Sequence, residues 1–313
     1  MVVVAVARGT GGVGKTIVSQ LERSKNHAVF VLSRTIPENQ APGGAQFIKV
    51  DYNDKVSLTR RLEEHKIEAV VSTINLQNEA ASNAQLNLIE AANASETTKR
   101  FIPSEFAFVA SLEDAEAEPS VGFALKSVDA LRESNLEFTR FANGFFMDYW
   151  GQPHIQSNLW AYIWAIDVAN KRAAIPGTGD DILSLTCSVD VAKFVVRTLE
   201  SSDKWPEISV LSGSDITFNQ LLAIAERIRG SKFDVKYDSI EALEKNDATL
   251  LQAGYGGGGG ASEDEAKQMV SLFGRLTISG NFRLPTENRI NDKFPGLHPT
   301  TAEELLETAW TGK

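Results

Sequence analysis

The sequence predicts an α/β fold in which a doubly wound parallel sheet precedes a smaller, mainly helical C-terminal domain. Three observations lead to this prediction. Between residues 2 and 102, short apolar runs of strand length alternate with longer segments of helical periodicity. A cluster of glycines follows the first apolar run almost directly, and the C-terminal third of the chain shows mostly helical periodicity.

The strands and helices of the first part can be assigned in chain order. The run at 2–7 consists of Val and Ala without a polar interruption, which is typical of a strand buried on both faces of a parallel sheet. Helical spacing of apolar residues begins at Lys15, and a second strand is expected at 28–32. Further strands are expected at 46–50, 69–74 and 100–102, with helices at 56–66 and 77–94.

The order is less regular beyond residue 105. Acidic residues at 113–118 predict a solvated loop, followed by a helix at 123–134 and a strand at 137–141. A helix at 190–200 and a strand at 208–211 are expected to return to the main sheet, and the remaining helices are expected at 218–228, 239–245, 263–272 and 301–309. We therefore divide the chain into a first domain at 1–150, joined by 180–212, and a second region at 151–313.

Composition and charge exclude several classes of function. The net charge of −10 argues against nucleic acid as a partner, because phosphate backbones bind to positive surfaces. No apolar stretch approaches the roughly 20 residues of a membrane-spanning helix, and the single cysteine, Cys187, excludes an intramolecular disulfide. We expect a soluble cytoplasmic protein that is a monomer or homodimer. The four scattered histidines predict no metal site, and no GxSxG nucleophile motif occurs.

The glycine cluster at residues 9–16 satisfies two phosphate-binding motifs. Gly9, Gly11 and Gly14 match the dinucleotide pattern GxGxxG, and the same stretch with Lys15 and Thr16 matches the P-loop pattern GxxxxGK[ST]. Both patterns place backbone N–H groups and a helix N-terminus against an anion. The loop alone therefore predicts a phosphate site without specifying the nucleotide.

The residue after the second strand distinguishes the two nucleotides. In a Rossmann-type dinucleotide fold, the side chain that meets the adenosine ribose lies about 20 residues beyond the glycines. Here Arg34 lies 20 residues after Gly14 and offers a charged fork to a 2′-phosphate, which favours NADP(H) over NAD(H). A P-loop needs an acidic residue for magnesium after a later strand. Asp51 is the only candidate, and it fits a contact with adenine equally well.

Other residues repeat the pattern of a known family. The segment Arg-Phe-Ile-Pro-Ser-Glu-Phe at 100–106 resembles the NmrA-like and isoflavone-reductase-like group of atypical short-chain dehydrogenases. Matching segments in the expected order are the glycine loop with Arg34 and residues 123–126, 143–146, 175–179, 190–192 and 291–296. The resemblance covers nearly the whole chain, and the Gly-rich stretch near residue 255 is most similar to the fungal branch.

The resemblance implies an NADPH-dependent oxidoreductase of small aromatic substrates, acting at a benzylic carbon or a conjugated double bond. In plant reductases of the group, a lysine at the position of Lys126 is the catalytic group. The usual short-chain dehydrogenase pair is Tyr-x-x-x-Lys, but Gly122 stands four residues before Lys126, so no phenol acts from there. An alternative is a non-catalytic NADP(H)-sensing regulator of the NmrA type, which binds a protein partner.

The resemblance makes Lys126 the candidate catalytic residue, whereas without it an ordinary exposed helix lysine is the expectation. Hydride delivery to a conjugated acceptor builds negative charge on a distant oxygen. A donor held at such an oxygen contributes on the order of 10²-fold in rate. Lys126 can supply it as an ammonium, transfer a proton if it is buried, or hold the nicotinamide ribose. The expected substrate is a small aromatic or polyketide-like secondary metabolite with an enone, quinone-methide-like or benzylic group.

The remaining candidates line the same expected site. Ser72 and Thr73 end a strand on the cofactor side of the sheet, and nine aromatic residues between Phe138 and Trp164 indicate either a buried core or an apolar pocket. The predicted cofactor-binding residues are Gly9, Thr10, Gly11, Gly12, Val13, Gly14, Lys15, Arg34, Asp51, Ser72, Thr73, Lys126 and Asn143. The predicted substrate-binding residues are Glu105, Phe106, Phe146 and Tyr149. A glycine-rich surface loop is expected at 254–260.

Overall fold

The computed structural model describes residues 1–38, 43–117, 121–252 and 262–313. The chain forms two compact units: the first consists of Met1–Ala142 and Val191–Ser209, and the second of Asn143–Asp190 and Val210–Lys313. The sequence prediction placed the first division after residue 150 and the returning segment at 180–212. The chain thus leaves the first unit earlier than predicted and returns to it over a shorter stretch.

The first unit is built on a six-stranded sheet with the strand order β3-β2-β1-β4-β5-β6. All neighbouring pairs are parallel, and the order runs outward in both directions from β1, as in a doubly wound Rossmann-type sheet. The strands are β1 (Val2–Ala7), β2 (His27–Ser33), β3 (Gln46–Lys49), β4 (Ala69–Ser72), β5 (Arg100–Ile102) and β6 (Glu137–Phe138). The predicted fold class is confirmed.

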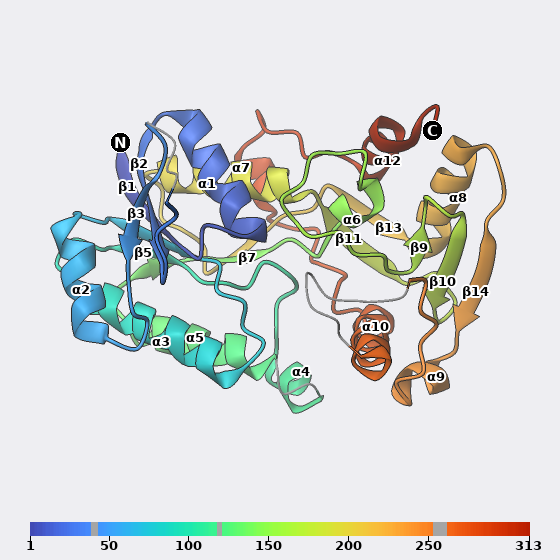
Figure 1. Ribbon diagram of the computed structural model, residues 1–313, viewed down its shortest axis with the longest axis horizontal. Helices are drawn as coiled ribbons and strands as arrows, with labels where there is room; N and C mark the ends of the chain where they lie inside the picture. The colour runs from blue at the N-terminus through green and yellow to red at the C-terminus, as the bar shows by residue number, and fades with distance from the viewer. Residues whose placement is uncertain (39–42, 118–120, 253–261) are drawn as a thin grey trace. The chain divides into compact units, whose positions relative to one another are not determined.

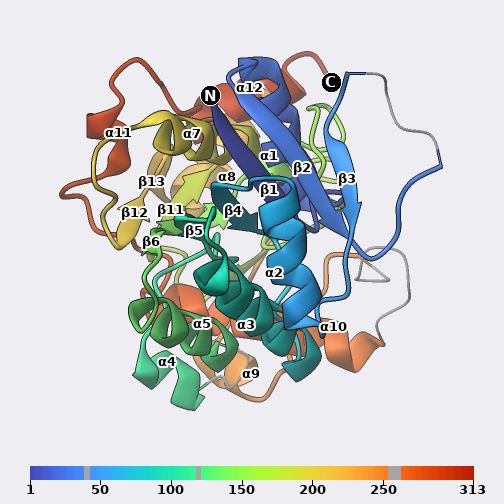
Figure 2. The same ribbon diagram turned by 90° about the vertical axis from the view of Figure 1, so that its left-hand side faces the viewer.

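Helices cover both faces of this sheet. Figures 1 and 2 show α2 (Lys55–Glu64), α3 (Glu79–Ala94) and α5 (Gly122–Arg132) on one face and α1 (Gly12–Ser24) and α7 (Ser188–Glu200) on the other. Because both faces are covered, the residues from Val4 to Ala7 have no exposed surface. The sheet therefore supplies a rigid edge at which the carboxyl ends of β1, β2 and β4 present their loops.

Two predicted segments differ from the structure. Strand β12 (Ile208–Val210) does not extend the six-stranded sheet as predicted but pairs with β7 (Arg140–Ala142) in a separate two-stranded ladder. Thr139 directly precedes β7, and its hydroxyl lies 2.8 Å from the hydroxyl of Ser209 in β12. The predicted acidic loop at 113–118 contains the short helix α4 (Leu112–Ala117). Its start is fixed because the Ser111 hydroxyl accepts the amide of Asp114, whose carboxylate accepts the Ser111 amide.

The second unit contains helices and two small sheets with the orders β14-β10-β9 and β13-β11-β8. The helices are α6 (Asp148–Gly151), α8 (Phe218–Arg229), α9 (Ile240–Glu244), α10 (Glu263–Ile278), α11 (Ile290–Lys293) and α12 (Ala302–Trp310). The strands are β8 (Phe145–Phe146), β9 (Ile166–Asp167), β10 (Arg172–Pro176), β11 (Ile182–Thr186), β13 (Ser214–Thr217) and β14 (Asp234–Asp238). The two sheets were not predicted, because their strands are too short for a clear period-2 pattern.

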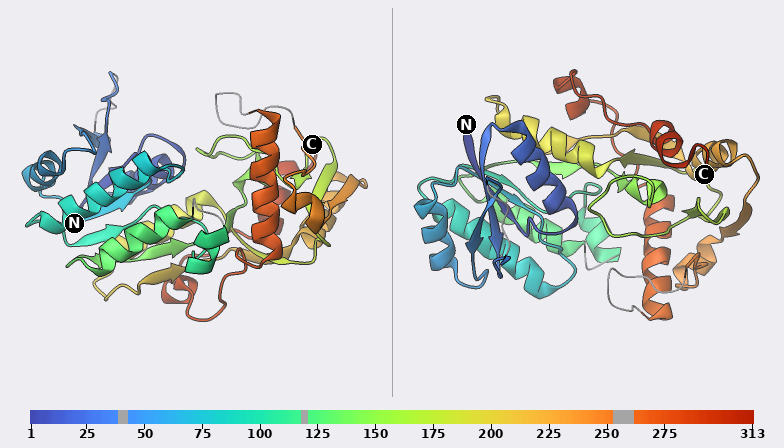
Figure 3. Two further views of the ribbon diagram at one scale, coloured as in Figure 1. Left: turned by 90° about the horizontal axis from the view of Figure 1, so that it is seen from below. Right: turned by 45° about the horizontal axis from the view of Figure 1, so that its top comes forward.

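Three helices of the second unit begin at strong capping signals. Thr217, Ser262 and Thr301 each form a capping box at the start of α8, α10 and α12. Figure 3 shows α10 as a long straight helix, in orange, next to the short α9. The predicted loop at 254–260 lies outside the described residues. Within the described ranges, no helix combines the length and apolarity needed to cross a bilayer.

Candidate active site

The phosphate loop connects β1 to α1 in the first unit. Gly11 is the N-cap residue of α1, no side chain caps the helix, and its first turn contains no acidic residue. The position that a Cβ of Gly11 would occupy has no neighbouring atom within 4 Å, and Thr10, Gly11 and Lys15 are exposed. The free N–H groups and the positive end of the helix dipole are thus open to an anion, as the sequence predicted.

The shape of this loop depends on close packing at Gly14. A Cβ at Gly14 would lie 2.4 Å from Thr73 Oγ1, 2.7 Å from the carbonyl oxygen of Arg8 and 3.0 Å from Gly9 Cα. The Thr73 hydroxyl donates to the carbonyl oxygens of Ala7 at 2.7 Å and Arg8 at 3.3 Å. Thr73 was predicted to bind the cofactor, and the structure shows its hydroxyl fastening the loop to the end of β4. Ser72 beside it has no exposed surface.

A cavity of about 490 Å³ lies beside the phosphate loop. It brings together Arg34 and Asp51, which were predicted from the sequence, with Arg8, which was not. The other lining residues are Tyr52, Asn53, Ile74, Asn75, Gln77, Asn78, Ala80, Ala81 and Ala84. All of them belong to the first unit, so the cavity is a property of that unit alone.

Tyr52 forms the buried wall of this cavity. Its hydroxyl donates to the carbonyl oxygen of Leu32 at 3.0 Å, which fixes the ring against the end of β2. Burial raises the pKa of Tyr52 above its ordinary value, while the neighbouring charges of Arg8 and Arg34 oppose that rise. Asp51 accepts the amide of Asn53 at 2.9 Å and so orders the turn that follows β3. The cavity therefore combines two guanidinium groups, one carboxylate and a fixed aromatic ring.

Lys126 lies exposed on α5, with its Nζ 5.6 Å from the centre of the Phe123 ring. Among the described residues, no carboxylate forms an ion pair with it. The exposure favours the role of a fixed ammonium over that of a buried proton donor, so the first of the predicted roles fits the structure best.

The helix that carries Lys126 is anchored through a buried amide. Gln85 on α3 has no exposed surface, and its Nε2 donates to the hydroxyl of Ser127 at 2.9 Å. Its Oε1 accepts the amide of Ser104 at 3.0 Å. One side chain thus connects α5 to the segment that follows β5. Sequence reasoning missed Gln85, because a glutamine on an Ala-rich helix carries no sign that it is buried.

Glu105 has a structural partner. Its Oε2 accepts from Nε of Arg140 at 2.6 Å and its Oε1 from the terminal guanidinium nitrogen, and the two side chains are only 6% and 5% exposed. Although burial lowers the pKa of Arg140, the carboxylate raises it above the ordinary value. This differs from the predicted substrate-binding role, because both carboxylate oxygens are engaged by Arg140. Phe106 is also buried and packs on Phe141 at 6.2 Å between ring centres.

The sequence left a buried core and a pocket wall open for the aromatic segment, and several of its rings form most of a core in the second unit. Phe145, Trp150 and Trp164 are 8%, 2% and 2% exposed and pack with ring centres 4.6 to 6.4 Å apart. Rings from distant parts of the chain complete this aromatic cluster, namely Phe218, Phe273 and Phe282. The rings predicted to touch substrate, Phe146 and Tyr149, are the half-buried ones. Burial and then Asp148 raise the pKa of Tyr149 to about 12, so it stays a neutral phenol.

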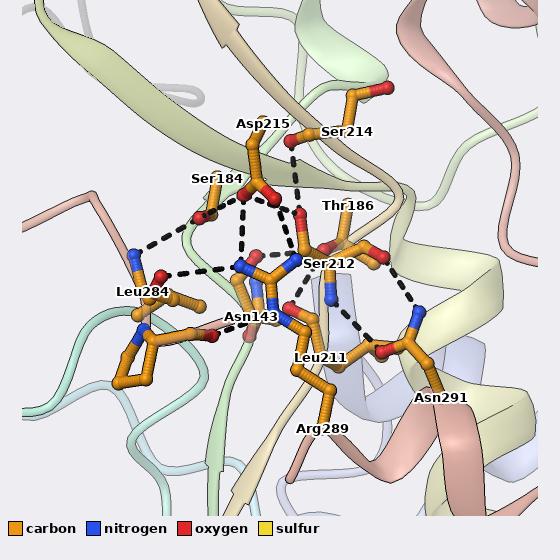
Figure 4. Close-up of polar contacts among 11 residues, drawn as sticks. Asn143, Ser184, Thr186, Leu211, Ser212, Ser214, Asp215, Leu284, Arg289 and Asn291 are labelled. Atoms are coloured by element: carbon orange, nitrogen blue, oxygen red, sulfur yellow. Dashed lines mark hydrogen bonds and ion pairs between the residues drawn. The ribbon is translucent and has the colours of Figure 1, made fainter. Parts of the chain in front are cut away.

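Asn143 begins the second unit and is fully buried. Its carbonyl oxygen accepts the hydroxyl of Thr186 at 2.8 Å, and Oδ1 has no hydrogen-bond partner within the described part of the chain. Figure 4 shows Asn143 beside a network centred on Asp215, which accepts two bonds from Arg289 and one from the hydroxyl of Ser184. Asn143 was predicted to contact the cofactor. In the structure its backbone carbonyl is held by Thr186 of β11.

The same network gives a structural role to part of the family-like segment at 291–296. Nδ2 of Asn291 donates to the carbonyl oxygen of Ser212 at 2.8 Å, as Figure 4 shows. Burial raises the pKa of Asp215, but the hydrogen bonds from Arg289 and Ser184 outweigh burial and hold this pKa below its usual range. Among the described residues, no group of three or more His, Cys, Asp or Glu side chains is arranged to hold a metal ion.

Several known proteins are similar to this chain in sequence or in fold. The chain matches the model of the NmrA-like family over residues 2–284. It is 38% identical over 234 residues to oxidoreductase BOA1 of Botryotinia fuckeliana, covering 74% of this chain and 78% of that protein. It is 30% identical over 346 residues to oxidoreductase swnN of Metarhizium robertsii, covering 100% of this chain and 98% of that protein.

More distant similarities reach plant reductases. The chain is 26% identical over 246 residues to bifunctional pinoresinol-lariciresinol reductase 1 of Linum usitatissimum, covering 73% of this chain and 75% of that protein. The solved complex of leucoanthocyanidin reductase from Vitis vinifera with NADPH superposes with a TM-score of 0.75 at 18% identity, over 97% of this chain and 98% of that one. The second likeness concerns the fold. The chain therefore belongs to the NmrA-like family and is an oxidoreductase.

Proposed function

We propose that this protein is an NADPH-dependent reductase that transfers hydride to a small aromatic or conjugated secondary metabolite. The observation that carries the proposal is the cavity of about 490 Å³ that Arg34 and Asp51 line together with Arg8, the residue directly before the glycine loop. An oxidoreductase of this family needs a hydride carrier, and these residues match the chemistry of a phosphorylated dinucleotide.

The residues of the first unit fit NADP(H) part by part. The uncapped start of α1 and the empty space at Gly11 suit the pyrophosphate, which backbone N–H groups would hold. Arg34 suits the 2′-phosphate, and Asp51 suits adenine or its ribose. When bound, the cofactor supplies the hydride. The chain contributes the loop that orients it, held in shape by Gly14 and the Thr73 hydroxyl.

Lys126 is the catalytic residue of this proposal. Its exposed ammonium stabilises the oxygen on which negative charge builds as the substrate accepts hydride. The charge stays available because no described carboxylate pairs with it. The bond from Gln85 to Ser127 fixes the helix one residue further on, so that the ammonium is presented from a rigid support.

The substrate class rests on two kinds of support. A relative that is 26% identical acts, by its name, on pinoresinol and lariciresinol, which are aromatic lignans. In the second unit, Phe146 and Tyr149 are half-buried and lie next to the aromatic cluster in the sequence, and Tyr149 packs on Phe145 with ring centres 5.5 Å apart. We propose these two rings for substrate contact, since flat apolar ligands bind against such surfaces. Tyr149 contributes its face and a neutral hydroxyl rather than an anion.

The test is oxidation of NADPH, followed by its absorbance, with a panel of enones, quinones and benzylic ethers, together with identification of the products. We expect turnover of at least one class of acceptor and a preference for NADPH over NADH of at least about 10-fold, as a lost charged hydrogen bond predicts. Micromolar NADPH binding without turnover of any acceptor would contradict the proposed reaction and favour a sensor. A preference for NADH would contradict the role of Arg34.

A further inference from the structure

Arg8 has an unusual backbone conformation. It directly follows β1 and has a φ of 57°, in the left-handed region that glycine adopts freely and arginine rarely does. A non-glycine residue held there costs on the order of 1 kcal/mol or more. The next residue is Gly9, so a glycine could stand at this turn. The chain instead places an arginine there.

The backbone of Arg8 is fixed from two sides. Its amide donates to the carbonyl oxygen of Leu32 at 3.1 Å, and its own carbonyl oxygen accepts from the Thr73 hydroxyl at 3.3 Å. The hydroxyl of Tyr52 donates to the same Leu32 oxygen. These bonds tie the turn to the ends of β2 and β4, so the direction in which the Arg8 side chain leaves the backbone is set by the sheet.

That direction is toward the cavity. Arg8 lines it together with Arg34, and both guanidinium groups act electrostatically on Tyr52. Both side chains are exposed, and neither forms an ion pair with any described residue. Asp51 is the one carboxylate that lines the cavity within the described ranges. The other polar lining groups are neutral, namely the Tyr52 phenol and the amides of Asn53, Asn75, Gln77 and Asn78. Two unpaired cations therefore share a space otherwise lined by neutral groups and one carboxylate.

We propose that Arg8 is a second cofactor-specificity residue, which binds the 2′-phosphate of NADP(H) together with Arg34. This inference rests on the proposed NADP(H) dependence and extends it to a residue outside the glycine pattern. A phosphate monoester carries about −1.5 to −2 charges at pH 7, so one guanidinium leaves it only partly neutralised. A second fork, entering from the β1 side of the cavity, balances the remainder and supplies further charged hydrogen bonds.

The inference also accounts for the strained turn. Replacing Arg8 with glycine relieves the backbone but removes the second cation, so protein stability and cofactor selectivity should change in opposite directions. A residue with a merely structural role would not produce that pair of effects.

The test measures binding of 2′,5′-ADP and 5′-ADP to the full chain by titration calorimetry. These two ligands differ only in the 2′-phosphate and lack the nicotinamide, so no turnover is needed. In the Arg8→Gln variant we expect affinity for 2′,5′-ADP to fall by about 10-fold or more, as for loss of a charged hydrogen bond. Affinity for 5′-ADP should change by less than about 2-fold, and Arg8→Lys should restore part of the loss.

A matched control uses Lys25, which ends α1 with the same φ of 57°. Lys25→Gly removes one positive charge and relieves the same backbone strain at the opposite end of the helix from the cavity. Both Lys25→Gly and Arg8→Gly should raise the Tm by roughly 1–3 °C, the size expected for relief of about 1 kcal/mol in a chain of this length. Only Arg8→Gly should lower the affinity for 2′,5′-ADP.

The outcomes separate this inference from the proposed cofactor. If Arg34→Gln abolishes the preference for 2′,5′-ADP and Arg8→Gln does not, the Arg8 inference is wrong while NADP(H) dependence stands. Equal losses for both ligands in Arg8→Gln would also overturn it, since they indicate a contact with adenine or the 5′-phosphates. If the wild-type protein shows no preference for 2′,5′-ADP, the cofactor assignment itself fails.

Discussion

In the first unit, the cations Arg8, Arg34 and Lys126 stand exposed without an ion-pair partner in the described ranges. In the second unit, the rings of Phe145, Trp150 and Trp164 are buried against one another. Unpaired surface cations add little to stability, so these three side chains are available to a ligand without loss of an ion pair. Packed aromatic rings contribute strongly to stability, so their density does not by itself identify a pocket.

The largest effect should come from the buried rings. Phe145→Ala should lower the free energy of unfolding by about 3–5 kcal/mol, because it leaves a cavity in the aromatic cluster. Its neighbour Phe146 is only half-buried, and Phe146→Ala should cost roughly 1 kcal/mol while raising KM for the substrate. Urea unfolding and steady-state kinetics of the two variants test the contrast. An equal loss of stability in both would place Phe146 in the core.

The second prediction concerns Lys126. Lys126→Ala should lower kcat by on the order of 10²-fold, since one charge-stabilising donor is lost, and leave NADPH binding within a few fold. Lys204→Ala, at another exposed lysine of the first unit, should change neither quantity. Unchanged turnover in Lys126→Ala would remove Lys126 from the mechanism. A large loss of NADPH affinity would assign it to cofactor binding instead.

The third prediction separates two glycines of the phosphate loop. Gly14→Ala should cost about 1–3 kcal/mol of stability, because its Cβ would meet the Arg8 carbonyl and the Thr73 hydroxyl. Gly11→Ser should leave stability unchanged or slightly higher, because Ser is favoured at an N-cap. Its hydroxyl would nevertheless compete for the free N–H groups, and NADPH affinity should fall by roughly 10-fold. Thermal unfolding and NADPH titration should therefore show a loss of stability in Gly14→Ala and a loss of affinity without a loss of stability in Gly11→Ser.

The smallest effect is the pH dependence due to His27, whose side chain is fully buried on β2. Burial lowers its pKa below the ordinary value of 6.5, and the N-terminal ammonium adds to this, whereas Glu200 at 3.6 Å opposes it. The unfolded chain then binds a proton more readily, so stability is complete above pH 6.5 and declines as the pH falls toward the folded-state pKa. The loss should stay below about 1 kcal/mol.

His27→Gln should flatten this decline in urea-unfolding midpoints measured between pH 7 and 5. Asp215 provides a separate acid-sensitive point, since its pKa lies below its usual range and its bonds to Arg289 are lost only at lower pH. A decline of the same size in His27→Gln as in the wild-type protein would assign the effect to other groups.

Long-range sheet topology in the first unit could be predicted from the sequence, because strands such as β1 and β2 are long and uninterrupted, and a glycine loop fixes where the first one ends. The position of Arg34 in the cavity also followed from spacing alone. Arg8 was missed because a left-handed backbone conformation at an arginine leaves no trace in the residue types. The pairing of Glu105 with Arg140 was missed because nothing in the sequence relates residues 35 positions apart.

In the second unit, the sequence indicated the aromatic segment but not how its rings are used. Phe145 packs against Phe273 and Phe282, which come from distant helices and loops, so their contact depends on the tertiary fold. Short strands such as β8 and β9 exist because neighbouring strands complete their hydrogen bonds, which no local pattern predicts. Buried amides such as Gln85 also depend on partners that are distant in the sequence, so no local pattern predicts them.

The division of the chain into two units has a consequence for inheritance. The polypeptide passes between them at 142–143, inside helix α7 at 190–191, and at 209–210. A gene fragment encoding residues 1–142 would lack Val191, Phe194 and Val195, which are buried in the protein. A single uninterrupted gene segment therefore cannot encode the whole first unit without also encoding part of the second. Recombination that exchanges the other unit must preserve three junctions at once.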